Sequence, residues 1–197
     1  DFIPENHAIL ADASAHTTQR VFDEVLEGRY YGSGLALFAD YGETEHHHEH
    51  FDQCVGVFDH SSDCLASKGF QRLRIDLGGG AELDLYNTHL EAGGGDEDIA
   101  ARQSHVEQIL AAMLDQSADR AVLFMGDTNL HGDDAEDVEA LAILTEGAGL
   151  VDACDAIGCA EPGRIDRFLF RSGGGLVLEV TGWSVEGAFV DDQGTPL

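Results

Sequence analysis

The feature that most constrains the fold is an apolar run, Ala121–Met125, that ends directly in Gly126-Asp127-Thr128-Asn129. Five consecutive apolar residues between polar segments predict a buried strand. The glycine, carboxylate and amide that follow it place oxygen-bearing side chains at one point on the rim of a sheet. That arrangement suits a divalent cation, an attacking water or a phosphate oxygen.

Two further segments combine an apolar strand with polar residues. The run Leu83–Tyr86 leads into Asn87-Thr88-His89, and Arg164-Ile165-Asp166-Arg167 is followed by the apolar run Phe168–Phe170. Each segment alone is a weak signal, whereas three of them in this order are specific.

The order Asn-Thr-His, Gly-Asp-Thr-Asn, Ile-Asp-Arg resembles the motifs of the endonuclease/exonuclease/phosphatase superfamily. This superfamily holds deoxyribonuclease I-like nucleases, apurinic endonucleases, inositol phosphatases and sphingomyelinase-like phosphodiesterases. Gly34–Phe38 is similar to its glycine-led strand, and Asp63–Phe70 to a segment of its secreted, sphingomyelinase-like members. The resemblance implies an α/β fold, a sandwich of two mixed β-sheets flanked by helices.

The resemblance also implies a metal-dependent phosphodiesterase and a role for each motif. Asp127 would orient the attacking water, and Asn129 would hold a phosphoryl oxygen or help to place that water. His89 would donate to the phosphoryl oxygens, where charge develops in the transition state. Asp166 would orient a partner histidine, as the aspartate of a catalytic triad does.

A divalent ion would bridge the phosphate and the protein at this site, with Asp127 and Asn129 as its ligands. The resemblance favours Mg²⁺, with Mn²⁺ or Ca²⁺ as alternatives. Asn87 and Arg167 are the candidates for binding the phosphodiester substrate.

Structural roles remain as alternatives for the same residues. Asp127 and Asn129 also fit an Asx turn after a strand, which is a common arrangement. Asp166 could pair with a neighbouring arginine on the surface, and His89 could be a hydrogen-bonded histidine at a strand end.

Parts of the superfamily pattern have no counterpart in these 197 residues. No strand with an asparagine and no strand ending in a metal-binding glutamate precedes Asp1. A final Ser-Asp-His motif, which would supply the partner of Asp166, would begin about where Leu197 stands. We therefore expect residues 1–197 to be an excerpt, inactive alone, of a single domain that lacks its first and last strands here. The alternative is a non-catalytic binding or assembly module, completed by another chain.

The formal net charge is -28, and Lys68 is the only lysine. Such a surface repels polyanions, which makes nucleic acid the less expected phosphodiester. Together with the segment Asp63–Phe70 it favours the sphingomyelinase-like branch, which implies a phospholipid head group at a membrane surface as the substrate. Adaptation to high salt, a calcium-rich or extracellular setting, and a merely acidic solvated surface all remain open as explanations of the charge.

Four cysteines form two close pairs, Cys54 with Cys64 and Cys154 with Cys159. Pairing by proximity is one of three possible connectivities. We favour two disulfides, and hence a secreted or periplasmic protein, over free buried thiols. No run of about 18 apolar residues is present, so no transmembrane helix is expected.

The run Glu45–His50 holds four histidines among carboxylates and is a weak candidate for a transition-metal site. In an extended strand, His46, His48 and His50 would share one face. A histidine-rich metal-binding protein is therefore the third hypothesis, after the phosphodiesterase and the binding or assembly module. His131 follows the Asp127 motif and fits a solvated loop residue better than a substrate contact.

Periodicity and turn residues predict the remaining organisation. Residues 6–29 are expected to be helical in two stretches, the second being Thr17–Leu26, and the segment 43–57 has no clear pattern. Asp98 is the expected N-cap of a helix that runs through Leu114. Further expected elements are a helix over 134–144, with Val138, Leu141 and Leu144 facing inward, and strands over 35–39, 69–77, 82–86, 165–170 and 176–180.

Overall fold

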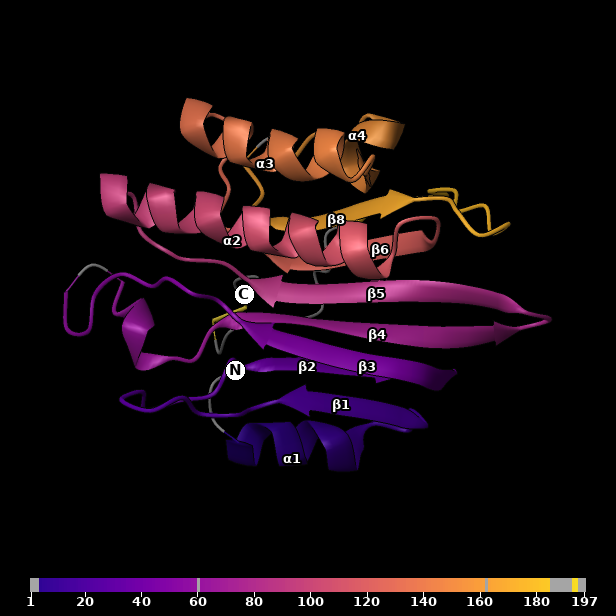
Figure 1. Ribbon diagram of the computed structural model, residues 1–197, viewed down its shortest axis with the longest axis horizontal. Helices are drawn as coiled ribbons and strands as arrows, with labels where there is room; N and C mark the ends of the chain where they lie inside the picture. The colour runs from indigo at the N-terminus through magenta and orange to yellow at the C-terminus, as the bar shows by residue number, and fades with distance from the viewer. Residues whose placement is uncertain (1–3, 60, 162, 185–192, 195–197) are drawn as a thin grey trace.

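The computed structural model describes residues 4–59, 61–161, 163–184 and 193–194. Its larger sheet has six strands in the order β3-β4-β5-β6-β8-β7 (Figure 1). The strands β5 and β6 are parallel and all other neighbours are antiparallel, so this sheet is mixed. Their bounds are β3 Gly42–His50, β4 Gly69–Gly78, β5 Ala81–His89, β6 Ala121–Asp127, β7 Val151–Asp152 and β8 Asp166–Arg171.

A second sheet is formed by β1 (Thr18–Phe22) and β2 (Leu35–Ala39), which pair antiparallel. Leu37 of β2 belongs to the same buried apolar cluster as Leu73 of β4 and Leu85 of β5. The two sheets therefore pack through a shared apolar layer, and the predicted two-sheet α/β sandwich is confirmed. Within the described residues this second sheet has two strands and is antiparallel, where the sequence predicted a mixed one.

Two helices cover the opposite face of the larger sheet. They are α2 (Asp96–Gln116) and α3 (Ala135–Gly147), which lie together at the top of Figure 1. Ile109 and Met113 of α2 pack with Phe124 of β6 in the main core. The helix α2 connects the parallel strands β5 and β6, a crossover that parallel pairing requires.

Three short elements complete the described chain: α1 (Pro4–Ala13), α4 (Ala153–Ile157) and the 3-10 helix η1 (Asp63–Leu65). In Figure 1, α1 lies below β1, at the opposite end of the view from α3. No helix in the described part of the chain is long and apolar enough to cross a bilayer.

The predicted helix over Thr17–Leu26 is wrong, because residues 18–22 form strand β1. The segment contains the β-branched residues Thr18 and Val21, which lose rotamer freedom in a helix. Its backbone groups pair instead with β2, and Phe22 is buried against the rings of His48 and His50. Tertiary pairing therefore overrides the apparent helical spacing.

The predicted strand over Leu176–Val180 is also wrong. Its expected partner β8 already has β6 on one side and β7 on the other, so no edge of β8 is open. A single bridge, Gly173 with Leu176, remains of the predicted hairpin. Leu176 and Leu178 pack instead against the apolar layer between the sheets.

Smaller differences concern the two long helices and an edge strand. Gly95, not Asp98, caps α2, and the Asp98 carboxylate accepts a hydrogen bond from the Gly95 N–H at 2.9 Å. In α3, Val138 faces solvent because Asp137 turns inward to pair with the buried Arg102. The polar run without a clear pattern forms β3, since an edge strand needs only backbone pairing with β4.

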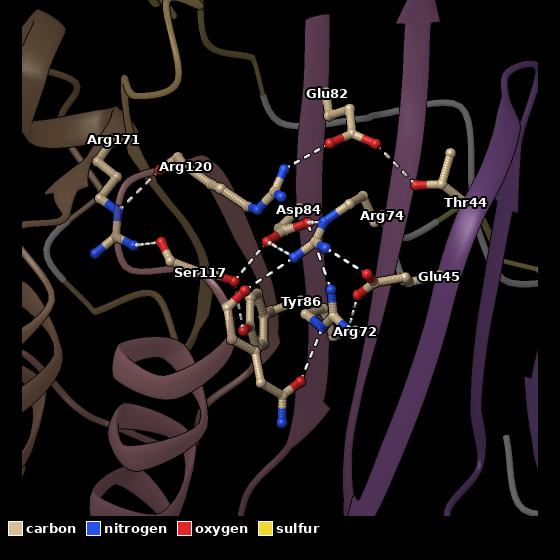
Figure 2. Close-up of polar contacts among 11 residues, drawn as sticks. Thr44, Glu45, Arg72, Arg74, Glu82, Asp84, Tyr86, Ser117, Arg120 and Arg171 are labelled. Atoms are coloured by element: carbon tan, nitrogen blue, oxygen red, sulfur yellow. Dashed lines mark hydrogen bonds and ion pairs between the residues drawn. The ribbon is translucent and has the colours of Figure 1, made fainter. Parts of the chain in front are cut away.

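A polar network joins the larger sheet to the C-terminal end of α2 (Figure 2). The fully buried Asp84 carboxylate accepts hydrogen bonds from the Arg74 guanidinium at 2.6 and 3.0 Å and from Ser117 Oγ at 2.5 Å. Arg74 also donates to the Gln116 carbonyl, one of the last carbonyls of the helix. The network thus satisfies acceptors that a helix C-terminus leaves without partners.

Both predicted disulfides are formed, Cys54–Cys64 and Cys154–Cys159. Reduction should destabilise the protein, because the loops that they close gain entropy in the unfolded chain, roughly 2–3 kcal/mol for each bond. A melting curve with and without dithiothreitol measures this effect, with free thiols counted before the scan. Identical melting temperatures, once both bonds are shown to be reduced, would contradict it.

Candidate active site

Three of the predicted site residues stand in one row across neighbouring strands. His89 at the end of β5 pairs in register with Asp127 of β6, and Asp127 pairs in register with Asp166 of β8. Paired residues on adjacent strands project to the same face, about 5 Å apart. The Nε2 atom of His89 lies 3.6 Å from Oδ2 of Asp127.

The backbone around Asp127 depends on glycine at the preceding position. Gly126 has φ of 148°, and a Cβ atom there would lie 2.1 Å from the Thr88 carbonyl oxygen. Glycine therefore allows β6 to pass close to β5 just before the motif.

The Asx turn expected as an alternative for Asp127 is present. Asn129 has φ of 48°, and its N–H donates to Asp127 Oδ1 at 3.0 Å. Its side-chain Nδ2 donates to the Leu90 carbonyl at 3.2 Å, which ties the turn to the end of β5. The turn uses Oδ1, so Oδ2 of Asp127 is directed toward His89.

A cavity of about 340 Å³ borders this row. His89 and Asp127 lie on its wall, and Asn87 lines it while donating from Nδ2 to the Ala36 carbonyl at 3.2 Å. Strand β2 and helix α1 form the other wall, where His7 is 5% exposed. Neither ring nitrogen of His7 has a hydrogen-bond partner among the described residues. The sequence pattern assigned no role to this histidine.

Arg167 does not reach the cavity. Side chains alternate along β8, so Arg167 points to the face opposite that of Asp166 and is 4% exposed. Its guanidinium donates to Asp152 at 3.2 Å and to the Leu130 carbonyl at 2.8 Å. The prediction that Arg167 binds substrate is therefore corrected to a structural ion pair.

Comparison with known proteins places this site in a family context. No family model matches the chain. Over 152 residues the chain is 30% identical to the sphingomyelinases of Mycobacterium tuberculosis and Mycobacterium bovis, a segment that covers 70% of this chain. The match covers 30% of those curated relatives, so the chain spans about a third of their length.

Solved structures share the fold at lower identity. Sphingomyelinase C from Streptomyces griseocarneus superposes with a TM-score of 0.64 at 18% identity, covering 85% of this chain and 66% of that one. TDP2 of D. rerio, solved with a single-strand DNA product, gives a TM-score of 0.70 at 18% identity, covering 99% and 78%. The chain belongs to the endonuclease/exonuclease/phosphatase superfamily.

The His89 side chain of this superfamily member is a neutral imidazole at neutral pH. Burial and the nearby Lys68 ammonium lower the pKa of His89 to about 4, although Asp127 acts in the opposite direction. A neutral ring offers one N–H donor and one lone pair. His89 can therefore donate to a phosphoryl oxygen without carrying a charge of its own.

The pKa of Asp166 is shifted upward, whereas that of His89 is shifted downward. Partial burial and the negative charge of Asp127 both raise the pKa of Asp166. Two carboxylates in register on neighbouring strands repel each other, and a bound cation would relieve that repulsion.

The described residues do not form a closed metal cage. No group of three or more His, Cys, Asp or Glu side chains is arranged to hold an ion in the described part of the chain. Mg²⁺, however, commonly uses one or two carboxylates and completes its shell with waters and phosphate oxygens. Asp127 and Asp166 fit that mode of binding, and the Asn129 side chain lies at the same strand end.

Sequence reasoning missed the buried charges behind the site. Lys68 is 5% exposed, donates to the Leu90 carbonyl at 2.7 Å and pairs with Asp63 at 2.9 Å. Glu91, two residues after His89, is fully buried and accepts the Val55 N–H at 2.7 Å. The one available signal was that the only lysine of so acidic a chain lies within the segment that resembles secreted members.

The histidine run lies on β3, at the edge of the larger sheet. Nε2 of His48 is 3.5 Å from the exposed Glu24 carboxylate, and Nδ1 of His50 donates to the Ser67 carbonyl at 2.9 Å. The rings of His48 and His50 pack against Phe22 in tilted arrangements, with ring centroids 4.5 and 4.6 Å away. These contacts explain the histidines as an edge-strand surface, and no three-ligand metal site is present among the described residues.

Glu91→Gln should change the pH dependence of stability. Burial, with Asp63 adding to it, raises the pKa of Glu91 from 4.5 to about 7. The folded state therefore binds more protons than the unfolded state between these values, and stability falls as pH rises through this window. Relative to the variant, the wild type should lose roughly 3 kcal/mol between pH 4.5 and pH 8.

Urea unfolding at a series of pH values measures this difference. Glu107→Gln on the exposed face of α2 is the matched control and should follow the wild type. Parallel stability curves for wild type and Glu91→Gln would contradict the assignment of a raised pKa.

Proposed function

We propose that this domain hydrolyses a phosphodiester, and that its substrate is the head-group phosphodiester of a sphingomyelin-type lipid. The observation that carries the proposal is the row of His89, Asp127 and Asp166 in register beside a cavity. The identity with the mycobacterial sphingomyelinases supports the choice of lipid.

The geometry suggests a division of work between the side chains. The Asp127 carboxylate is held by the Asn129 N–H through Oδ1 and can orient a water through Oδ2. The neutral His89 donates to the phosphoryl oxygen that gains charge in the transition state. Asn87 and Asn129 border the same strand ends and position the phosphate, while Asp166 orients a neighbouring group at the rim.

A divalent ion, for which we propose Mg²⁺, belongs beside Asp127 and Asn129, with the Asp166 carboxylate in register with Asp127 on the next strand. When bound, it would neutralise the phosphoryl charge and favour attack by water. The solved beta toxin from Staphylococcus aureus with bound magnesium ions shares the fold with a TM-score of 0.63, at 15% identity over 79% of this chain and 62% of that one.

The charge of the chain supports lipid over nucleic acid. At -28, the protein repels a polyanion far more strongly than a zwitterionic head group. We further propose that the protein is exported, in keeping with its two disulfides, and that residues 1–197 are part of one domain of a longer chain.

A hydrolysis assay of the natural gene product tests the proposal. With Mg²⁺, it should cleave sphingomyelin in vesicles faster than a single-stranded oligodeoxynucleotide. Removing the metal with EDTA should lower turnover by about 10² or more, and added Mg²⁺ should restore it. Cleavage of DNA alone would overturn the lipid assignment, and no cleavage of either would favour the non-catalytic binding module.

A further inference from the structure

Two loops at the same end of the sheets expose apolar side chains (Figure 1). The first connects β1 to β2, and the second, residues 51–62, follows β3. We call the exposed set the apolar loop patch. Its members are Val25, Leu26, Tyr30, Tyr31, Val57 and Phe58, and Phe58 is 83% exposed.

The first loop contacts the second loop and the residues that follow it. The Arg29 guanidinium donates to Cys54 Sγ of the second loop at 2.7 Å, and the other contacts are made with residues 65–67. The N–H groups of Tyr30 and Tyr31 donate to the Leu65 carbonyl at 2.8 and 3.0 Å. Tyr31 also forms a β-bridge with Ala66, and the Leu26 N–H donates to Ser67 Oγ at 2.9 Å. The apolar side chains are therefore held by a common scaffold.

The tip that carries Phe58 is itself braced. The disulfide Cys54–Cys64 closes its base, and the Cys64 N–H donates to the Gly56 carbonyl at 2.9 Å. Gly56 has φ of 76°, and a Cβ atom there would clash with the Asp59 carbonyl oxygen at 2.3 Å. Phe58 is thus exposed on a constrained turn, and that exposure carries a hydration cost that a partner would remove.

The patch lies at the same end of the sheets as the candidate active site. The Val55 N–H of the second loop donates to Glu91, and the Ala92 N–H donates to Asp63 of η1, so the second loop and the helix after it both contact the residues that follow His89. The first loop leads directly into the cavity wall at Leu35. Figure 1 shows both loops at the left, where β5 ends.

The local charge limits which partner fits. Arg29 is the only arginine or lysine in these loops, and its guanidinium donates to the Cys64 carbonyl at 2.6 Å. Five carboxylates accompany it: Asp23, Glu24, Glu27, Asp52 and Asp59. An anionic surface would be repelled, whereas aromatic and aliphatic side chains partition into the interface of a zwitterionic bilayer.

We propose that the apolar loop patch docks the protein on a zwitterionic, phosphocholine-rich lipid surface and presents the active-site cavity to it. This inference rests on the proposed function, because the docked surface would carry the substrate. Phe58 and Val57 insert at the interface, and Tyr30 and Tyr31 lie at head-group level.

Vesicle binding and hydrolysis by the natural protein test the inference. The Val57→Ala/Phe58→Ala variant should bind sphingomyelin–phosphatidylcholine vesicles about tenfold more weakly or worse in a co-sedimentation assay. Its turnover of a soluble diester, bis(p-nitrophenyl) phosphate, should stay at the wild-type level. Leu114→Ala/Val138→Ala removes exposed apolar side chains from α2 and α3 and should leave vesicle binding unchanged.

A second variant tests the docking surface independently, so that the test does not depend on the folding of Val57→Ala/Phe58→Ala. Tyr30→Ser keeps the backbone contacts with Leu65 and should also weaken vesicle binding, with an unchanged melting temperature. Equal vesicle binding by the wild type and both loop variants would overturn the docking surface. A wild type that binds no vesicles, or that uses the patch to form dimers, would overturn it as well. Vesicle binding without hydrolysis of either substrate would overturn the proposed function and leave the docking surface standing.

Discussion

Asp127→Asn in the natural protein is expected to lower kcat by about 10²–10³ with the fold intact. The substitution keeps the Oδ1 acceptor for the Asn129 N–H but removes the negative charge beside His89. A loss of activity in this variant would therefore come from the lost charge and not from a disrupted Asx turn. Steady-state hydrolysis of the diester measures the effect, and a melting curve shows whether the fold is retained.

Asp133→Asn is the matched control, since Asp133 is an exposed carboxylate in the loop that follows the motif. It should keep the wild-type rate. His89→Ala should cost a similar factor to Asp127→Asn, and the double variant should lose less than the product of the two single effects if both residues act in one step. Wild-type turnover in both single variants would remove these residues from the active site.

Asp84→Ala should lower the free energy of unfolding by roughly 3–5 kcal/mol, because it removes the buried counter-charge of two buried arginines and leaves them only the half-exposed Glu45 carboxylate. Arg74 is 5% exposed and bonds Asp84 at 2.6 and 3.0 Å, and Nη1 of the buried Arg72 lies 3.6 Å from the same carboxylate (Figure 2). Ser117 also loses its acceptor. Urea unfolding gives the difference directly.

Glu82→Ala is the control for the same strand. Glu82 lies two residues from Asp84, and its partner Arg120 is part-exposed, so the change should shift the unfolding midpoint little. Replacing Arg74 and Asp84 together by Met and Leu should recover part of the loss, since both charges then leave the core. A change below about 1 kcal/mol in Asp84→Ala would show that the buried arginines find other partners.

Local sequence patterns predicted the elements that carry the site. The apolar run before Gly126 and the hairpin around Gly79 are strands in the structure, and their ends bring His89 and Asp127 together. These predictions hold because a strand buried on both faces and a glycine turn leave the chain few alternatives. The catalytic roles of these residues stay predictions until the variants are measured.

Other features depended on contacts between distant segments. Arg167 adjoins Asp166 in sequence, yet strand alternation turns it toward Asp152 and away from the cavity. Lys68 is buried beside the site because β5 ends at His89 and the carbonyl of the next residue, Leu90, accepts a hydrogen bond from its ammonium group. No local pattern carries that information.

The sequence by itself predicted the superfamily and the strand-end motifs, and it favoured the pairing of neighbouring cysteines, because each motif and each pair lies within a short segment of the chain. The tertiary structure alone decided that residues 18–22 are a strand, that Leu176–Val180 is not, and that Glu91 and Lys68 are buried behind His89. The physical reason is that strand pairing and burial depend on which edges and faces remain open. Those are properties of the assembled sheets and not of any one segment.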